Sequence, residues 1–203
     1  MNDDVMKSLR ESAPDYGIEL SEQQLNSFRI YLDELWEWNA HFNLTGLSGR
    51  RRIVMELFLD SLVPAPFLPQ EGKMLDVGSG GGLPGVPLKI YIPRLKTTFL
   101  EANSKKVSFL KHVVRLLRLE GTEVVHGRVE KKTAHTHQAG YDLITARALA
   151  GLGQTIAWCA PFLSPGGLLV GFLGSRAEKD LQENRAIIIK HRISPHRSIP
   201  DAL

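Results

Sequence analysis

The sequence predicts an α/β protein in which a helical N-terminal segment precedes a mostly parallel β-sheet with helices on both faces. Up to about residue 62, apolar residues recur at helical spacing. After residue 72, short apolar runs alternate with helical stretches of about ten residues or more, which is typical of a parallel sheet. Residues 63–72 contain three prolines and break the pattern. We therefore expect a helical extension over residues 1–65 and an α/β domain over residues 66–203.

The helical extension carries its own start signal. Ser21 and Gln24 have the spacing of a capping box, which predicts that a helix begins there. The apolar residues that follow at helical spacing are Leu25, Phe28, Leu32, Leu35 and Trp36. A further helix is expected over residues 56–62.

The α/β domain is expected to contain six strands, at residues 73–78, 96–102, 122–127, 141–148, 166–173 and 186–193. Helices are expected at residues 85–91, 105–119 and 152–162. The core face of the second of these helices is predicted to consist of Val107, Leu110, Val114 and Leu117. Ligands of such sheets bind beyond the carboxyl ends of the strands, and a glycine-rich loop follows the first predicted strand.

Composition sets limits on location and partners. The chain has 43% hydrophobic and 23% charged residues, and its 25 basic and 22 acidic residues leave a net charge of +3, which permits a polyanionic partner without requiring one. Its single cysteine, Cys159, excludes an internal disulfide framework. The N-terminus lacks the apolar core of a signal peptide, and the apolar runs are too short to span a membrane. We expect a cytoplasmic protein with no membrane partner.

The glycine-rich loop, residues 74–85 (MLDVGSGGGLPG), suggests a nucleotide-like ligand. A nucleoside triphosphate loop is excluded because no Gly-Lys-Ser/Thr follows. A dinucleotide loop is harder to exclude, because Gly80, Gly82 and Gly85 spell G-x-G-x-x-G and Glu101 lies 19 residues after Gly82. However, Pro84 has no N–H to offer a pyrophosphate.

Asp76 favours a different ligand. An acid at this position repels pyrophosphate, but it suits the amino group and sulfonium of S-adenosyl-L-methionine. The pattern apolar-Asp-apolar-Gly-x-Gly-x-Gly resembles the nucleotide-binding loop of class I methyltransferases, in which an acid such as Glu101 at the end of the second strand binds the ribose hydroxyls. A tight strand-to-helix turn without a ligand is the alternative interpretation.

A more specific resemblance extends over roughly residues 20–175. The segments WNAHFNLTGL (38–47), LDSL (59–62), LDVGSGGGLPGVPLKI (75–90), LEANSKKVSFL (100–110), GRVEK (127–131) and ITARALA (144–150) occur in the order found in the 16S ribosomal RNA guanine-N7 methyltransferase family (RsmG, glucose-inhibited division protein B). The chain resembles this family. The resemblance implies a class I S-adenosyl-L-methionine-dependent methyltransferase (Rossmann-like) fold and methylation of N7 of a guanine in 16S small-subunit ribosomal RNA.

The resemblance also implies roles for individual residues. Arg147 corresponds to an arginine beside the reacting centre and is the expected catalytic residue. The expected cofactor-binding residues are Asp76, Gly78, Gly80, Gly82, Leu83, Glu101, Val129, Glu130 and Arg147. The expected RNA-binding residues are Lys105, Lys106, Arg128 and Arg197. No metal site is expected, because His135 and His137 lack further ligands nearby.

The partner is expected to be 16S ribosomal RNA or the small ribosomal subunit, bound by a monomer. Two other functions stay open. One is a class I methyltransferase with another acceptor. The other is a non-catalytic RNA-binding assembly factor, which two departures from the family pattern, Leu57 and Leu173, keep open. The short tail, with Pro195 and Pro200, puts a seventh strand in doubt.

Overall fold

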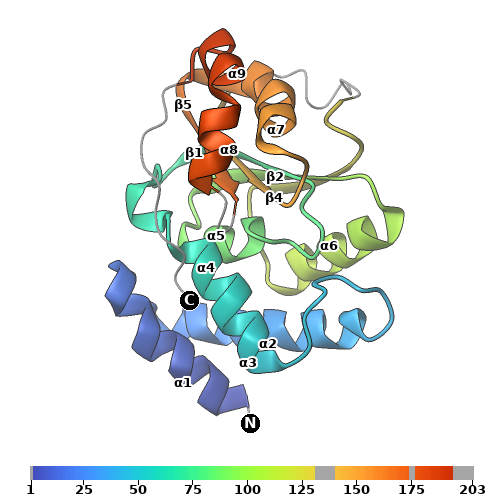
Figure 1. Cartoon of the computed structure of the whole chain (residues 1–203). Coiled ribbons are helices and arrows are strands. Elements are labelled where there is room, and N and C mark those ends of the chain that lie inside the picture. The colour runs from blue at the N-terminus through green and yellow to red at the C-terminus, as the bar shows by residue number, and fades with distance from the viewer. Residues whose placement is uncertain (1, 131–139, 174–176, 194–203) are drawn as a thin grey trace.

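The computed structural model describes residues 2–130, 140–173 and 177–193, and its centre is a five-stranded sheet (Figure 1). The strands are β1 (Gly72–Val77), β2 (Leu95–Glu101), β3 (Thr122–His126), β4 (Tyr141–Arg147) and β5 (Leu163–Phe172). Their order across the sheet is β3-β2-β1-β4-β5, and all four pairs are parallel. The expected parallel sheet is therefore confirmed.

Helices cover both faces of this sheet, as Figure 1 shows. On one face lie α5 (Gly85–Tyr91) and α6 (Ser104–Leu116), with the N-terminal helices beyond them. On the other lie α7 (Leu152–Cys159), the short 3-10 helix Ala160–Phe162, α8 (Ala177–Glu183) and α9 (Arg185–Lys190). The helix expected at residues 105–119 ends earlier, at Leu116. Two residues later, Arg118 takes a left-handed conformation with φ of 50°.

The N-terminal segment is helical, as expected. It consists of α1 (Asn2–Ser12), a 3-10 turn (Ala13–Tyr16), α2 (Glu22–Asn39), α3 (Arg50–Ile53), a π-helical turn (Val54–Leu59) and α4 (Asp60–Leu62), followed by a 3-10 turn (Ala65–Phe67). The capping box is confirmed, because the Ser21 side chain accepts a hydrogen bond from the Gln24 N–H and the Gln24 side chain accepts one from the Ser21 N–H. No helix among the described residues is both long and apolar enough to cross a membrane.

The prediction of a strand at residues 186–193 is wrong, because Arg185–Lys190 form helix α9. Three consecutive isoleucines favour a strand by intrinsic propensity. Packing decides otherwise: Ile188 is buried against Leu152 and Ile156 of α7, whereas Ile189 is 65% exposed. A single apolar stripe of this kind suits a helix lying on another helix.

The largest hydrophobic cluster joins the N-terminal helices to one face of the sheet. It contains Leu9 of α1 and Phe28 of α2 together with Val86 of α5, Phe99 of β2 and Phe109 of α6. The N-terminal helices therefore bury their apolar faces against the α5–α6 layer rather than against one another alone. A division of the chain at residue 65 stays a prediction.

Candidate functional site

The glycine loop and Arg147 lie at the same edge of the sheet, on neighbouring strands. The loop leaves the carboxyl end of β1, and Arg147 is the last residue of β4. In the ladder between these strands Asp76 is opposite Thr145 and Val77 is opposite Ala146. The chain proceeds outward from β1 to β2 and β3 and then returns to β4 on the other side of β1. Open α/β sheets bind their ligands at such a topological switch point.

A tyrosine of the N-terminal helices binds the glycine loop from the core side. The Tyr31 hydroxyl donates a hydrogen bond of 2.5 Å to the Gly81 carbonyl, and its ring stacks on Phe58 with 4.8 Å between centroids. Burial raises the pKa of Tyr31 well above its usual value, so this phenol stays protonated and remains a donor. Gly82 has a φ of 90° and leaves no room for a side chain, because a Cβ would lie 2.6 Å from Val86 Cγ2.

Asp76 is fully buried beneath the loop. One carboxylate oxygen, Oδ1, accepts a 2.7 Å hydrogen bond from Thr145 Oγ1, whereas Oδ2 has no hydrogen-bond partner among the described residues. Burial raises the pKa of Asp76 to about 6, and interactions with the Thr145 and Ser79 side chains and with the Gly85 N–H oppose that shift. Oδ2 lies against Gly85, where a Cβ would be 2.7 Å away, so it faces the start of α5.

Glu101, the last residue of β2, connects the loop to helix α6. Its two carboxylate oxygens accept hydrogen bonds from the Gly80 N–H at 2.8 Å and the Asn103 N–H at 2.7 Å. Asn103 in turn caps α6 by accepting from the Lys105 N–H. Each oxygen of a carboxylate accepts more than one hydrogen bond, so Glu101 retains capacity for further donors such as hydroxyl groups.

Arg147 is anchored on two sides. Its Nη2 lies 2.7 Å from Asp60 Oδ2 and 3.2 Å from Ser61 Oγ, and its guanidinium carbon lies 4.1 Å from the centre of the Phe172 ring. Its Nε is buried and has no hydrogen-bond partner among the described residues. The guanidinium is therefore held by a carboxylate, a hydroxyl and an aromatic face while part of its donor set remains unused.

The other expected cofactor residues occupy different surroundings. Gly78 lies under Leu149, whose Cδ1 would be 2.8 Å from a Cβ at that position. Leu83 is buried in the large cluster shared with the N-terminal helices, and Val129 is buried beside Leu100 and Val125. Glu130 is exposed and lies 3.7 Å from Arg128. Their contact with a cofactor stays a prediction.

The expected RNA-binding residues that the structure describes lie in two places at the carboxyl edge. Lys105 and Lys106 belong to the first turn of α6, where Lys105 Nζ lies 5.1 Å from the centre of the Phe42 ring. Lys106 Nζ lies close to the glycine loop, 4.0 Å from where a Cβ on Gly80 would be. Arg128 follows β3, which pairs with β2. Arg197 lies outside the described residues, as do His135 and His137.

Sequence reasoning assigned no role to several residues that hold the site. Tyr31, Asp60, Ser61 and Phe172 contact the glycine loop or Arg147. Asp60 and Ser61 belong to the LDSL segment that carried part of the family resemblance, which was a usable signal. Tyr31 occupies an ordinary buried position of a helix and Phe172 an ordinary strand position, so no local pattern distinguishes them from core residues.

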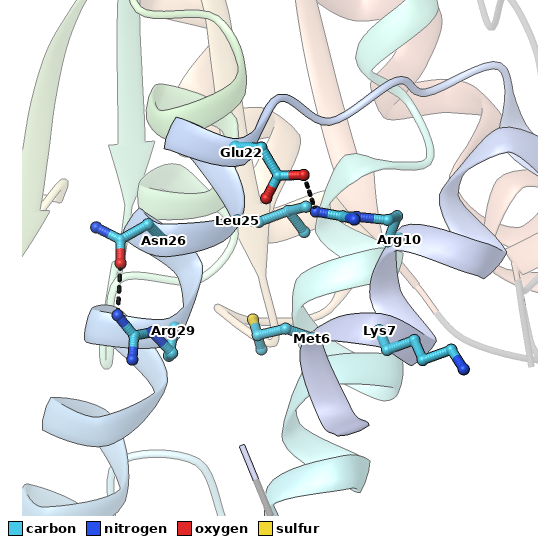
Figure 2. A pocket seen from close by; sticks show the side chains of 7 residues that line it. All are labelled: Met6, Lys7, Arg10, Glu22, Leu25, Asn26 and Arg29. Atoms are coloured by element: carbon cyan, nitrogen blue, oxygen red, sulfur yellow. Dashed lines mark hydrogen bonds and ion pairs between the residues drawn. The ribbon is translucent and has the colours of Figure 1, made fainter. Parts of the chain in front are cut away.

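A cavity of about 390 Å³ lies away from these residues, between α1 and α2 (Figure 2). Met6 and Leu25 contribute apolar surface, and the Arg10–Glu22 ion pair crosses it. None of the expected site residues lines this cavity.

The described residues contain no group of three His, Cys, Asp or Glu side chains that could hold a metal ion.

Cys159 is buried, and burial raises the pKa of its thiol to about 12, so it is an inert core residue rather than a nucleophile.

Comparisons with known proteins identify the family. Residues 24–200 match the GidB family model, described as rRNA small subunit methyltransferase G. Proteins named ribosomal RNA small subunit methyltransferase G from Alkaliphilus metalliredigens and Staphylococcus saprophyticus are 37% and 35% identical to this chain. The first alignment covers 89% of this chain and 77% of the relative, and the second covers 87% and 75%.

Among solved structures, P. horikoshii TYW2 in complex with MeSAdo aligns with a TM-score of 0.50 at 12% identity, covering 64% of this chain and 50% of that one. At this identity the likeness concerns the fold alone, and it agrees with the expected class I methyltransferase fold. The family resemblance inferred from the sequence motifs is confirmed by the family model and the relatives. The chain belongs to the GidB family, the rRNA small subunit methyltransferase G proteins.

Proposed function

We propose that this protein transfers the methyl group of S-adenosyl-L-methionine to N7 of a guanine in 16S small-subunit ribosomal RNA. The observation that supports this most strongly is the placement of Arg147 beside the glycine loop, across the switch point between β1 and β4. Relatives that match most of the chain are named ribosomal RNA small subunit methyltransferase G. We expect the enzyme to act in the cytoplasm, as a monomer, on the RNA or on the small subunit.

The residues at this edge fit the cofactor. Gly78, Gly80 and Gly82 leave the loop backbone free of side chains, and Glu101 stands at the end of the neighbouring strand, where it would accept the ribose hydroxyls. The carboxylate of Asp76 beneath the loop favours a positively charged group above it. Val129 and Glu130 would lie beside the adenine, and Gly78 and Leu83 would line the methionine and adenosine parts of the cofactor. When bound, S-adenosyl-L-methionine supplies an electrophilic methyl group on a sulfonium.

The reaction requires positioning rather than proton transfer. Guanine N7 carries a lone pair and no proton, so it attacks the methyl carbon as the sulfur–carbon bond breaks, and no general base is needed. Arg147 would hold the guanine through O6 or an adjacent phosphate, because N7 itself must stay free to react. Its anchorage by Asp60 and Phe172 restricts the directions in which it donates.

Glu101→Ala is expected to weaken cofactor binding. The substitution removes the acceptor for the ribose hydroxyls, and hydrogen bonds to a charged acceptor contribute about 1.5–3 kcal/mol each. It also removes the acceptor of the Gly80 N–H, so the loop loses support. Calorimetric titration with S-adenosylhomocysteine should show a loss of roughly 10-fold or more in affinity. Asp142→Ala, at the amino end of β4, is the control and should bind normally; an unchanged affinity in Glu101→Ala would remove Glu101 from the site.

RNA binding is expected to depend on charges at the carboxyl edge. If Lys105 and Arg128 contact phosphates, replacing both with alanine should flatten the dependence of log affinity on log salt by roughly 1.4–1.8. Filter binding across a salt series measures this slope. Lys73→Ala/Lys96→Ala removes the same charge from opposed residues at the amino end of β1 and β2, and it should leave the slope unchanged. Equal slopes in both double variants would make Lys105 and Arg128 ordinary solvated residues.

The function itself is tested with labelled S-adenosyl-L-methionine and unmethylated ribosomal RNA, offered as naked RNA, assembling subunits and mature subunits. The expected result is one labelled guanine, with the methyl group mapped to N7. Label on another acceptor would favour a different class I methyltransferase. RNA binding without transfer in any state would favour an assembly factor.

A further inference from the structure

We propose that Asp60, the first residue of α4, is a positioning residue that fixes the Arg147 guanidinium for methyl transfer. This inference rests on the proposed function, which places Arg147 at the reacting centre. It makes the N-terminal helical segment part of the catalytic machinery, because Asp60 comes from that segment and Arg147 from the sheet.

The contacts of Arg147 restrain it in more than one direction. Asp60 Oδ2 and Ser61 Oγ approach the same nitrogen, Nη2, at 2.7 and 3.2 Å. The ring of Phe172 covers one face of the guanidinium at 4.1 Å. The Arg147 and Asp60 side chains are only 19% and 25% exposed, so solvent screens their attraction less than it screens a surface pair. An arginine held in this way presents its remaining donors in a fixed geometry.

Asp60 is itself held in place by the core. It follows directly on the π-helical turn, and the neighbouring side chains of Leu59 and Leu62 are buried. The Ser61 hydroxyl donates to the Leu57 carbonyl, which leaves its oxygen oriented as an acceptor for Arg147. Because helix α4 is packed on its apolar side, the backbone of Asp60 is fixed, and its carboxylate moves only by rotation of its own side chain.

The chain contains a matched arginine that lies in the N-terminal helices. Arg50 has 20% side-chain exposure, pairs with Asp33 and lies 5.1 Å from the centre of the Trp36 ring. It therefore has the same three features as Arg147: partial burial, a carboxylate partner and an aromatic face. Asp33→Asn measures what the loss of such a carboxylate does to the fold alone.

The experiment compares Asp60→Asn with Asp33→Asn in single-turnover transfer from labelled S-adenosyl-L-methionine to unmethylated 16S ribosomal RNA. Asparagine keeps the shape of the side chain and removes its charge. For Asp60→Asn we expect the transfer rate to fall by up to roughly 100-fold, while the dissociation constants for RNA and S-adenosylhomocysteine stay within about twofold. Asp33→Asn should transfer at the normal rate. Asp60→Glu restores the charge and should recover part of the rate.

The decisive measurement repeats Asp60→Asn in an Arg147→Ala background. A residue that acts only through Arg147 should cause almost no further loss there. The same fractional loss in both backgrounds would overturn the inference, as would a normal rate in Asp60→Asn. Should Asp60→Asn fold poorly by thermal denaturation, Ser61→Ala takes its place with the same expectations. A wild-type enzyme that transfers no methyl group would overturn the proposed function and this inference together, whereas additive losses in an active enzyme would overturn this inference alone.

Discussion

Replacing Arg147 with alanine is expected to leave a folded protein whose methyl transfer falls by roughly 100- to 1000-fold, the size of effect seen when one oriented donor is removed from a reacting centre. The folded state should lose about 1–2 kcal/mol, because the Asp60 carboxylate is already one-quarter exposed beside its partner and is not left fully buried without it. Single-turnover kinetics and urea denaturation separate the two effects. Near-normal turnover would take Arg147 out of the catalytic set.

Lysine at position 147 is expected to restore the ion pair with Asp60 but little of the activity. Its ammonium is a single point charge, so it cannot contact Asp60 and Ser61 while a second nitrogen faces a guanine oxygen, as the planar fork of arginine can. The pH–rate profile of the wild-type enzyme should lack a limb assignable to a general base, because N7 loses no proton. A methyl group mapped to an exocyclic amine or a ribose hydroxyl would contradict the N7 assignment.

Gly82→Ala is expected to be among the most destabilising single substitutions in the chain. The residue has a φ of 90°, which costs a side-chain-bearing residue about 1–2 kcal/mol. Its Cβ would also lie 2.6 Å from Val86 Cγ2, and overpacking of this kind costs about 1–3 kcal/mol. We expect a loss of about 2–5 kcal/mol in the free energy of unfolding, measured by urea denaturation, together with loss of cofactor binding.

Gly46 provides the control for this prediction. It also has a positive φ, of 68°, but a Cβ there would meet no atom within 4 Å. Gly46→Ala should therefore show the backbone cost without the steric one, and it should leave cofactor binding intact. Equal losses in the two variants would mean that crowding around Gly82 is relieved by movement of Val86.

The sequence predicted the first five strands and the glycine loop that follows the first of them, because both depend on local patterns. Alternating apolar runs identify buried strands, and the glycine loop with Asp76 and Glu101 marks the strand edge where ligands bind. The prediction of a sixth strand was wrong because the structure of that segment depends on tertiary packing rather than on a local pattern. Three isoleucines in a row carry strong strand propensity, and only the packing of Ile188 against α7 makes this segment a helix.

The anchorage of Arg147 could not be predicted from the sequence. Asp60 and Phe172 are far from Arg147 along the chain, and their contacts depend on how the N-terminal helices and β5 pack around β4. The Tyr31 contact with Gly81 is of the same kind, since a phenol in an apolar helix face has no sequence signature of its target. Family motifs located Arg147, but its surroundings required the tertiary structure.

The large cluster that joins the N-terminal helices to the sheet has a consequence for synthesis of the chain. Leu9 and Phe28 leave the ribosome early, yet Phe99 and Phe109 of the same cluster are made much later. The last N-terminal helix, α4, ends at Leu62, and Val113 of α6 belongs to the cluster. At about 5–20 residues per second, the roughly fifty residues between them take about 3–10 s to translate. During that interval the nascent helices expose their apolar faces, which favours association with other chains. We therefore expect the N-terminal helices to depend on chaperone binding until α6 has emerged.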